Sequence, residues 1–175
     1  MISRCLIFFD ICEESIFINI LLKLTNKNNI IINIRLVNCG KCIILPNINL
    51  YTIFKGFLKL LTKQGKLIIQ LLNYSKILAE KERVVSINKN KNQVYIRFYD
   101  FMDSFIRFNV LRINWKNQRP QYCLTSSHLY PYIFSDLHIL LSKTNFLTIS
   151  TFGNMKFALF DENESQNLVM VCEKA

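Results

Sequence analysis

Leu60-Leu-Thr-Lys-Gln-Gly-Lys-Leu-Ile-Ile-Gln-Leu-Leu-Asn-Tyr74 is the stretch that decides the fold. Apolar residues at helical spacing over 49–61 run into it and predict an amphipathic helix. Gly65 suits the left-handed conformation that ends many helices. The apolar run Leu67–Leu72 then predicts a buried strand. A helix, a glycine and a buried strand in this order are typical of an α/β sheet.

The residues before this stretch predict two more strands and a helix. Leu6–Phe9 is a short apolar run that indicates a buried parallel strand, and apolar residues at helical spacing predict a helix over 13–25. The β-branched run Ile30–Val37 predicts the next strand. Strand, helix, strand, helix and strand in succession predict a parallel sheet with crossover helices.

The residues after the stretch predict a different architecture. Ser135 is expected to cap a further helix, and Phe146–Phe152 and Leu168–Cys172 to form two last strands. We expect one domain over 1–175, with an antiparallel insertion at about 83–127. The strands of this insertion are predicted, from their alternation of apolar and polar residues, at 83–88, 93–100, 104–114 and 121–127.

Composition narrows the class of protein. The chain has 175 residues, of which 51% are hydrophobic, enough for the core of a single domain. Its net charge of +10 is spread along the chain, which disfavours a nucleic-acid partner. Polar residues divide the most apolar region, 28–48, so we expect no membrane span. Six irregularly spaced cysteines suggest reduced thiols in the cytoplasm.

Two stretches carry a resemblance to a known family. The central stretch resembles the segment that leads into the fifth strand of class I S-adenosyl-L-methionine (SAM)-dependent methyltransferases, and the residues from Thr125 onward resemble their closing helix and hairpin. Arg97–Asp100 and Ile106–Asn109 resemble the insertion of small-molecule methyltransferases similar to glycine/sarcosine N-methyltransferases. The resemblance implies an α/β fold, with a Rossmann-like methyltransferase sheet, an antiparallel β insertion and a C-terminal β-hairpin.

The front of the chain resembles the family from its second strand onward. Phe9–Glu14 resembles the segment that closes that strand, so the first strand and its glycine-rich loop would stand before Met1. The resemblance therefore implies an incomplete sheet in an amino-terminally truncated domain. Losing a strand opens unpaired sheet edges, so we expect such a chain either to pair with a separate amino-terminal fragment or to be a remnant. A true start upstream of Met1 would equally explain the pattern.

The resemblance also implies the cofactor contacts. Asp10 matches the acid that accepts hydrogen bonds from the SAM ribose, although a strand-end or helix-capping acid is an equally ordinary interpretation. Leu36-Val-Asn-Cys-Gly40 resembles the wall under the methionyl end of the cofactor, so Cys39 and Gly40 are candidate cofactor-binding residues. Gly40 could also serve only a turn.

Polar and aromatic residues suggest a substrate pocket above the sheet. Tyrosine and arginine side chains can orient an amine or a carboxylate through hydrogen bonds and cation–π contact. The alternative is an amphipathic strand whose polar residues simply face the solvent. The candidate substrate-binding residues are Asn73, Tyr74, Arg97 and Tyr99.

Three functions fit these observations. The first is methyl transfer from SAM to a small molecule such as an amine, which needs alignment more than a dedicated base. The second is a non-catalytic remnant or partner-dependent interaction protein. The third is a thiol-redox protein built on the CxxC motif of Cys39 and Cys42. A single CxxC without a second pair does not predict a metal site, and His128 and His138 form no visible pair or triad.

Overall fold

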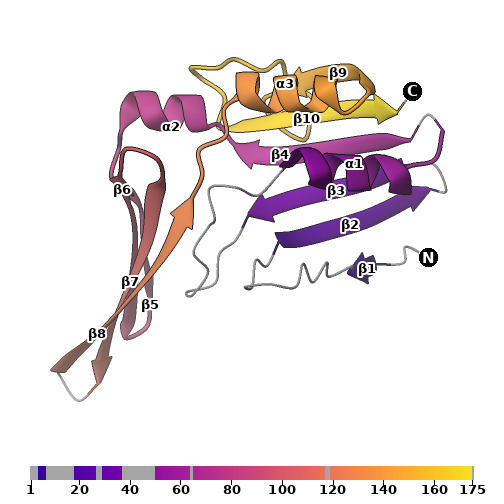
Figure 1. Cartoon of the computed structure of the whole chain (residues 1–175). Helices are drawn as coiled ribbons and strands as arrows, with labels where there is room; N and C mark the ends of the chain where they lie inside the picture. Colours follow the sequence, from indigo (N-terminus) through magenta and orange to yellow (C-terminus); the bar gives the residue numbers. More distant parts are fainter. Residues whose placement is uncertain are drawn as a thin grey trace.

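The computed structural model describes residues 4–6, 18–26, 29–36, 50–63, 65–116 and 119–174. This part of the chain forms two β-sheets and three helices (Figure 1). The larger sheet has six strands in the order β1-β2-β3-β4-β10-β9, and the smaller one has four in the order β5-β6-β7-β8. The strands of the larger sheet are β1 (Arg4–Leu6), β2 (Ile18–Asn26), β3 (Asn29–Leu36), β4 (Lys66–Leu72), β9 (Phe146–Phe152) and β10 (Asn167–Lys174).

A parallel pair, β3 and β4, lies in the middle of the larger sheet, with Asn29 opposite Lys66. The connection between them contains α1 (Leu50–Leu60), the helix that the amphipathic pattern predicts. Gly65 follows this helix but does not take the predicted left-handed conformation. A Cβ atom at Gly65 would lie 2.8 Å from the carbonyl oxygen of Thr62, so crowding explains the glycine.

Two predictions for the front of the sheet are wrong. Ile18–Asn26 forms strand β2, whereas the apolar spacing predicts a helix over 13–25. The spacing of apolar residues in a short run fits a helix as well as a strand. Here the residues form a strand because they pair antiparallel with β3. β1 pairs antiparallel with β2, so the expected parallel strand at Leu6–Phe9 is wrong in direction, and residues 7–9 lie outside the described residues. The expected βαβ alternation is therefore limited to β3, α1 and β4.

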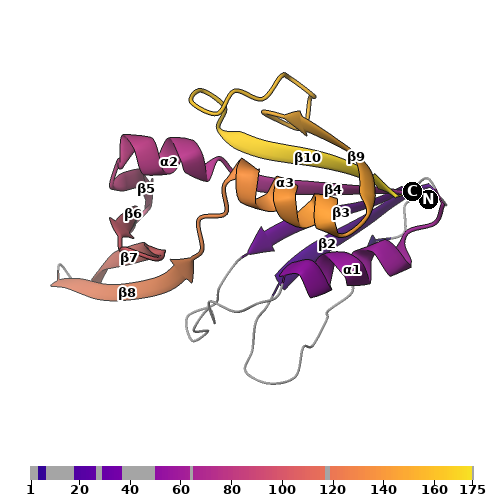
Figure 2. The same ribbon diagram turned by 45° about the horizontal axis from the view of Figure 1, so that its top comes forward.

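The closing hairpin of the predicted sheet is confirmed. β10 lies between β4 and β9 and runs antiparallel to both. Before this hairpin, α3 (Phe134–Lys143) packs beside α1 on one face of the sheet (Figure 2). The N-cap of α3 is Ile133, and no side chain caps it, so the prediction that Ser135 caps this helix is wrong.

The main core fills the space between these two helices and the sheet. β4 alternates between the two faces of the sheet, so its Leu67 and Ile69 both point toward α1 and α3. Burying one such Leu or Phe side chain contributes about 1.5–3 kcal/mol to the free energy of unfolding. The buried members of this core are Leu50, Phe54, Phe57, Leu61, Leu67, Ile69, Leu137, Leu141, Phe146, Leu168, Met170 and Cys172.

The smaller sheet confirms the predicted antiparallel insertion. Its strands are joined in sequence order and project away from the end of the larger sheet (Figures 1 and 2). A short helix that the sequence analysis did not predict, α2 (Tyr74–Glu80), links β4 to β5 and packs on the base of the small sheet through Tyr74, Tyr99 and Ile106. The four strands are β5 (Val84–Asn90), β6 (Gln93–Phe101), β7 (Ile106–Lys116) and β8 (Arg119–Leu129).

Candidate functional site

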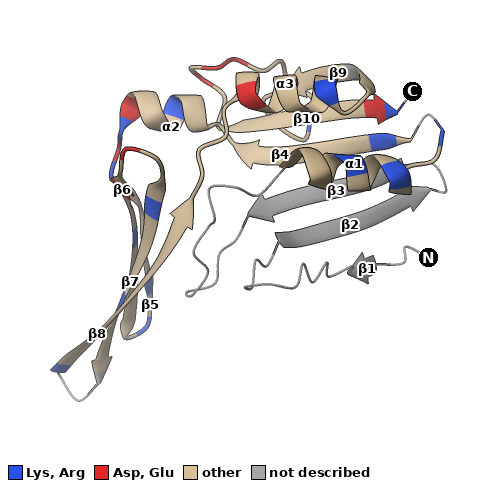
Figure 3. Ribbon diagram, in the orientation of Figure 1, with Lys and Arg blue, Asp and Glu red and all other residues tan. Residues whose placement is uncertain are grey.

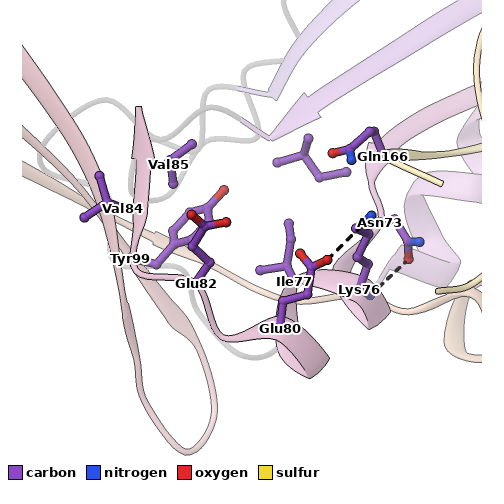
Figure 4. A pocket seen from close by; sticks show the side chains of 10 residues that line it. Asn73, Lys76, Ile77, Glu80, Glu82, Val84, Val85, Tyr99 and Gln166 are labelled. Carbon is purple, nitrogen blue, oxygen red and sulfur yellow. Dashed lines mark hydrogen bonds and ion pairs between the residues drawn. The ribbon is translucent and has the colours of Figure 1, made fainter. Parts of the chain in front are cut away.

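A pocket of about 240 Å³ opens between the two sheets, at the carboxyl end of β4. Ligands of open α/β sheets bind outside the carboxyl ends of the parallel strands, and β4 is one of the two parallel strands here. Acidic residues gather near this end of the molecule, on α2 and in the loop before β10 (Figure 3). The pocket is lined by Leu72, Asn73, Lys76, Ile77, Glu80, Glu82, Val84, Val85, Tyr99 and Gln166 (Figure 4).

Asn73 forms the corner of the pocket between β4 and α2. Its side chain is only 3% exposed, and its Nδ2 atom donates hydrogen bonds to the carbonyl oxygens of Glu162 and Ser165 at 2.7 and 2.9 Å. Its Oδ1 atom accepts from the backbone N–H of Lys76, the N-cap bond of α2. The Asn73 backbone N–H donates to the carbonyl of Gln166. Because its polar atoms are engaged in this way, Asn73 builds the pocket wall.

The charged residues of the pocket leave it net negative. Lys76 forms an ion pair with Glu80 one helical turn later, with an N–O distance of 3.5 Å, and its Nζ atom also donates to the carbonyl of Glu164. Glu82 adds a second carboxylate from the segment between α2 and β5. One ammonium and two carboxylates give a net charge of −1, in a chain whose net charge is +10.

Tyr99 brings a phenol to the pocket from β6, on the side of the small sheet. Burial raises the pKa of Tyr99 above its ordinary value of 10.0. Burial, and to a lesser degree the neighbouring Tyr99, raise the pKa of Tyr74 as well. Both phenols are therefore protonated at neutral pH. Tyr99 can donate or accept a hydrogen bond within the pocket.

The structure brings together two of the four predicted substrate-binding residues. Asn73 and Tyr99 both line the pocket, whereas Tyr74 is buried beneath it in the cluster between α2 and the small sheet. Arg97 does not line the pocket: it is half-buried further out on β6, where its Nη1 atom donates to Ser86 Oγ at 3.3 Å.

The predicted cofactor-binding residues Asp10, Cys39 and Gly40 lie outside the described residues, and so does the CxxC cysteine Cys42. Their roles stay predictions. The two histidines pack against aromatic rings in tilted geometry, His128 against Phe105 with centroids 4.4 Å apart and His138 against Phe134 with centroids 5.4 Å apart.

The acidic side of the pocket does not follow from the apolar patterns of the sequence. It is formed by residues that come directly after the stretch that decides the fold: Lys76, Glu80 and Glu82. The sequence does contain a signal for the helix α2 that carries these residues. Asn73 is a good N-cap residue, and Lys76 and Glu80 are spaced as an i,i+4 pair on a helix. A seven-residue helix between two strands is short enough for such a pattern to be overlooked.

Within the described ranges, no three His, Cys, Asp or Glu side chains gather as metal ligands would. No helix of this part of the chain is long and apolar enough to cross a membrane.

Comparison with solved structures identifies the fold. The chain superposes on an S-adenosylmethionine-dependent methyltransferase from Clostridium acetobutylicum ATCC 824 with a TM-score of 0.65 and 12% identity, over 87% of this chain and 61% of that one. It superposes on the CcbJ methyltransferase from Streptomyces caelestis with a TM-score of 0.59 and 12% identity, over 71% of this chain and 52% of that one. No family model and no curated protein matches the sequence.

The two superpositions define the fold class of this chain. The chain has the Rossmann-like α/β fold of SAM-dependent methyltransferases, with an antiparallel β insertion and a closing β-hairpin. It spans between about one half and three fifths of the length of these two neighbours.

Proposed function

We propose that this chain takes part in methyl transfer from SAM to the amine nitrogen of a small molecule. One observation carries the proposal: a net-negative pocket lies at the carboxyl end of β4 in a methyltransferase fold. Both structural neighbours are named as methyltransferases, which supports the reaction class.

The pocket residues suit an amine acceptor. Glu82 and Glu80 attract its ammonium form from solution, and the half-buried Lys76 holds the Glu80 carboxylate in place. The protonated phenol of Tyr99 offers a hydrogen bond that orients the acceptor. Ile77 and Val84 supply apolar walls that hold the carbon skeleton. Alignment of the acceptor is the main contribution that this kind of reaction needs from a protein.

The pocket suits the acceptor better than the whole cofactor. When bound, SAM supplies an electrophilic methyl group on a sulfonium sulfur. The volume of about 240 Å³ and the engaged amide of Asn73 fit a small molecule. We therefore assign the cofactor contacts to Asp10, Cys39 and Gly40, as the resemblance implies, and the described pocket to the acceptor.

Two measurements test this function. Isothermal titration calorimetry of the full chain with SAM should show binding, and mass spectrometry with a methyl-deuterated SAM should show label transfer to members of an amine panel. Glu82→Gln should weaken binding of the accepted amine roughly threefold, as expected for an exposed charge. Glu164→Gln removes the same charge from a side chain outside the pocket and should leave binding unchanged.

The opposite results would favour a different protein. A folded chain that binds no SAM and labels no amine would support the non-catalytic, partner-dependent interpretation. Binding that is equally sensitive to both Gln variants would show that overall charge, and not this pocket, recognises the amine.

A further inference from the structure

The small antiparallel sheet carries two unusual rows of side chains. The registers of its strands place one residue from each strand side by side across the sheet. One row consists of Ile87, Ile96, Leu111 and Leu124. The next row, toward the hairpin tips, consists of Lys89, Val94, Ile113 and Tyr122. The seven apolar residues of these rows and Phe98 form what we call the apolar face: Ile87, Val94, Ile96, Phe98, Leu111, Ile113, Tyr122 and Leu124.

The apolar face points away from the core of the protein. Side chains alternate between the two faces of a strand, so Phe98 and Tyr99 lie on opposite faces of β6. Tyr99 packs on α2, in the cluster that also holds Ile106. The apolar face is therefore the side of the sheet opposite α2. An ordinary one-sided antiparallel sheet shows the reverse arrangement, with its apolar face on the core.

Solvent reaches this face in the structure. Tyr122 is 68% exposed, and Ile87 and Leu124 are each 58% exposed. None of the eight residues belongs to either core cluster. Contiguous exposed apolar surface of this kind marks a site of interaction.

Most charges of the small sheet lie outside the two rows that a second copy would cover. Arg97 and Arg112 are on the opposite face, because each is next in sequence to residues of the apolar face on the same strand. Lys91 is at a hairpin tip, and Arg107 lies toward the base, opposite Asp100. Lys89, on edge strand β5, is the one charge within the two rows. Two copies can therefore stack face to face despite the net charge of +10.

The area of the face limits the surface that this contact can bury. Four strands and three levels of side chains measure roughly 20 Å by 20 Å, so a pair of copies would bury on the order of 800 Å². Stable interfaces bury about 1,200–2,000 Å². We propose that the apolar face binds the same face of a second copy of this chain, and that the two small sheets pack as an aligned β-sandwich. The dimer dissociates at micromolar concentration.

Sedimentation velocity of the full chain, from micromolar to hundreds of micromolar concentration, tests the dimer. The wild-type protein should shift from monomer to dimer over this range. Leu124→Glu should raise the dissociation constant about tenfold or more, because a carboxylate would be buried without a partner. Thr125→Glu changes the next residue of the same strand, which is exposed on the opposite face, and should dimerise like the wild type.

Three results would overturn the proposal. The first is a wild-type chain that stays monomeric at the highest concentration. The second is a dimer that Leu124→Glu leaves intact, since pairing through the edge of β8 alone would tolerate this change. The third is a monomer that cosediments with phosphatidylglycerol vesicles, which would make a lipid surface the occupant. Far-UV circular dichroism and thermal melting establish that both variants fold, and Tyr122→Glu gives an independent second variant.

Discussion

The side-chain amide of Asn73 donates a hydrogen bond of 2.7 Å to the backbone carbonyl of Glu162, 89 residues further along the chain. Asn73 follows the last residue of β4, and Glu162 lies in the loop that joins β9 to β10. Close by, the Ser75 hydroxyl donates a second hydrogen bond to Glu162, at its side-chain Oε1 atom. Asn73, Ser75 and Lys76 thus connect the corner of the pocket to this loop, and Asn73 is the buried one of the three.

Replacing Asn73 with alanine should destabilise the protein by about 2–3 kcal/mol, because two partly buried carbonyl groups and the N-cap of α2 lose their partner. Urea unfolding followed by circular dichroism measures the change. Asn163→Ala alters an exposed asparagine of the same loop and should cost less than about 0.5 kcal/mol. Equal losses in the two variants would mean that the Asn73 bonds do not hold the loop.

Leu141→Ala should cost about 2–5 kcal/mol, because Leu141 is fully buried between α3 and the sheet. Ile139 is on the same helix but 53% exposed, and Ile139→Ala should change the unfolding free energy by less than about 1 kcal/mol. Guanidinium titration of both variants gives the comparison. A larger loss at Ile139 would contradict the packing of this helix.

The cysteines Cys123 and Cys172 should differ sharply in reactivity. Burial raises the pKa of the Cys172 thiol from 9.0 to about 12, and no part of this side chain is exposed. The thiolate is the reactive form, so Cys172 should react with iodoacetamide only as fast as the protein unfolds. Cys123 is exposed on β8 and should react at once. Peptide mass spectrometry of the labelled chain reads both sites, and rapid labelling of Cys172 in the folded state would refute the burial.

Stability should fall as the pH rises above 10. Tyr74 and Tyr99 have raised pKa values in the folded state, mainly through burial. Above their ordinary pKa of 10.0 the unfolded chain releases these protons while the folded chain retains them, which favours unfolding. Burial also raises the pKa of Tyr132 and Cys172, which adds to this loss. Tyr74→Phe removes one of these groups and should reduce the loss of stability between pH 9 and pH 11 in denaturant titrations.

Tyr122→Phe is the matched control for this pH dependence, because Tyr122 is exposed on β8. It should follow the wild-type curve. A Tyr74→Phe curve that keeps the full wild-type slope would show that Tyr74 does not carry the effect.

Elements with a single strong pattern could be predicted from the sequence. Helix α1 and strand β4 follow one another with clear helical and buried-strand periods, and the alternation from 83 onward gives all four strands of the insertion. β2 could not be predicted, since Ile18–Asn26 fits helical spacing as well as alternation. The segment becomes a strand because it pairs with β3, and the spacing of its own apolar residues carries no information about this pairing.

The site was predictable only in part, for a similar reason. Asn73 and Tyr99 stand in patterned segments and were named as candidates, whereas Glu82 stands in the unpatterned link after α2. Its place in the pocket depends on how the small sheet packs against this helix. Arg97 and Tyr99 are two residues apart on the same face of β6, yet only Tyr99 is near enough to the base of the sheet to reach the pocket.

The position of β10 governs the order in which the chain acquires its structure. Each strand of the small sheet pairs with the strand before it, so these hairpins can form as soon as they are synthesised. β4, by contrast, must wait for a partner about 100 residues downstream. Until β10 leaves the ribosome, one side of β4 is an unsatisfied apolar edge. The nascent chain should therefore depend on chaperones during that interval, and slow translation before Asn167 should increase aggregation.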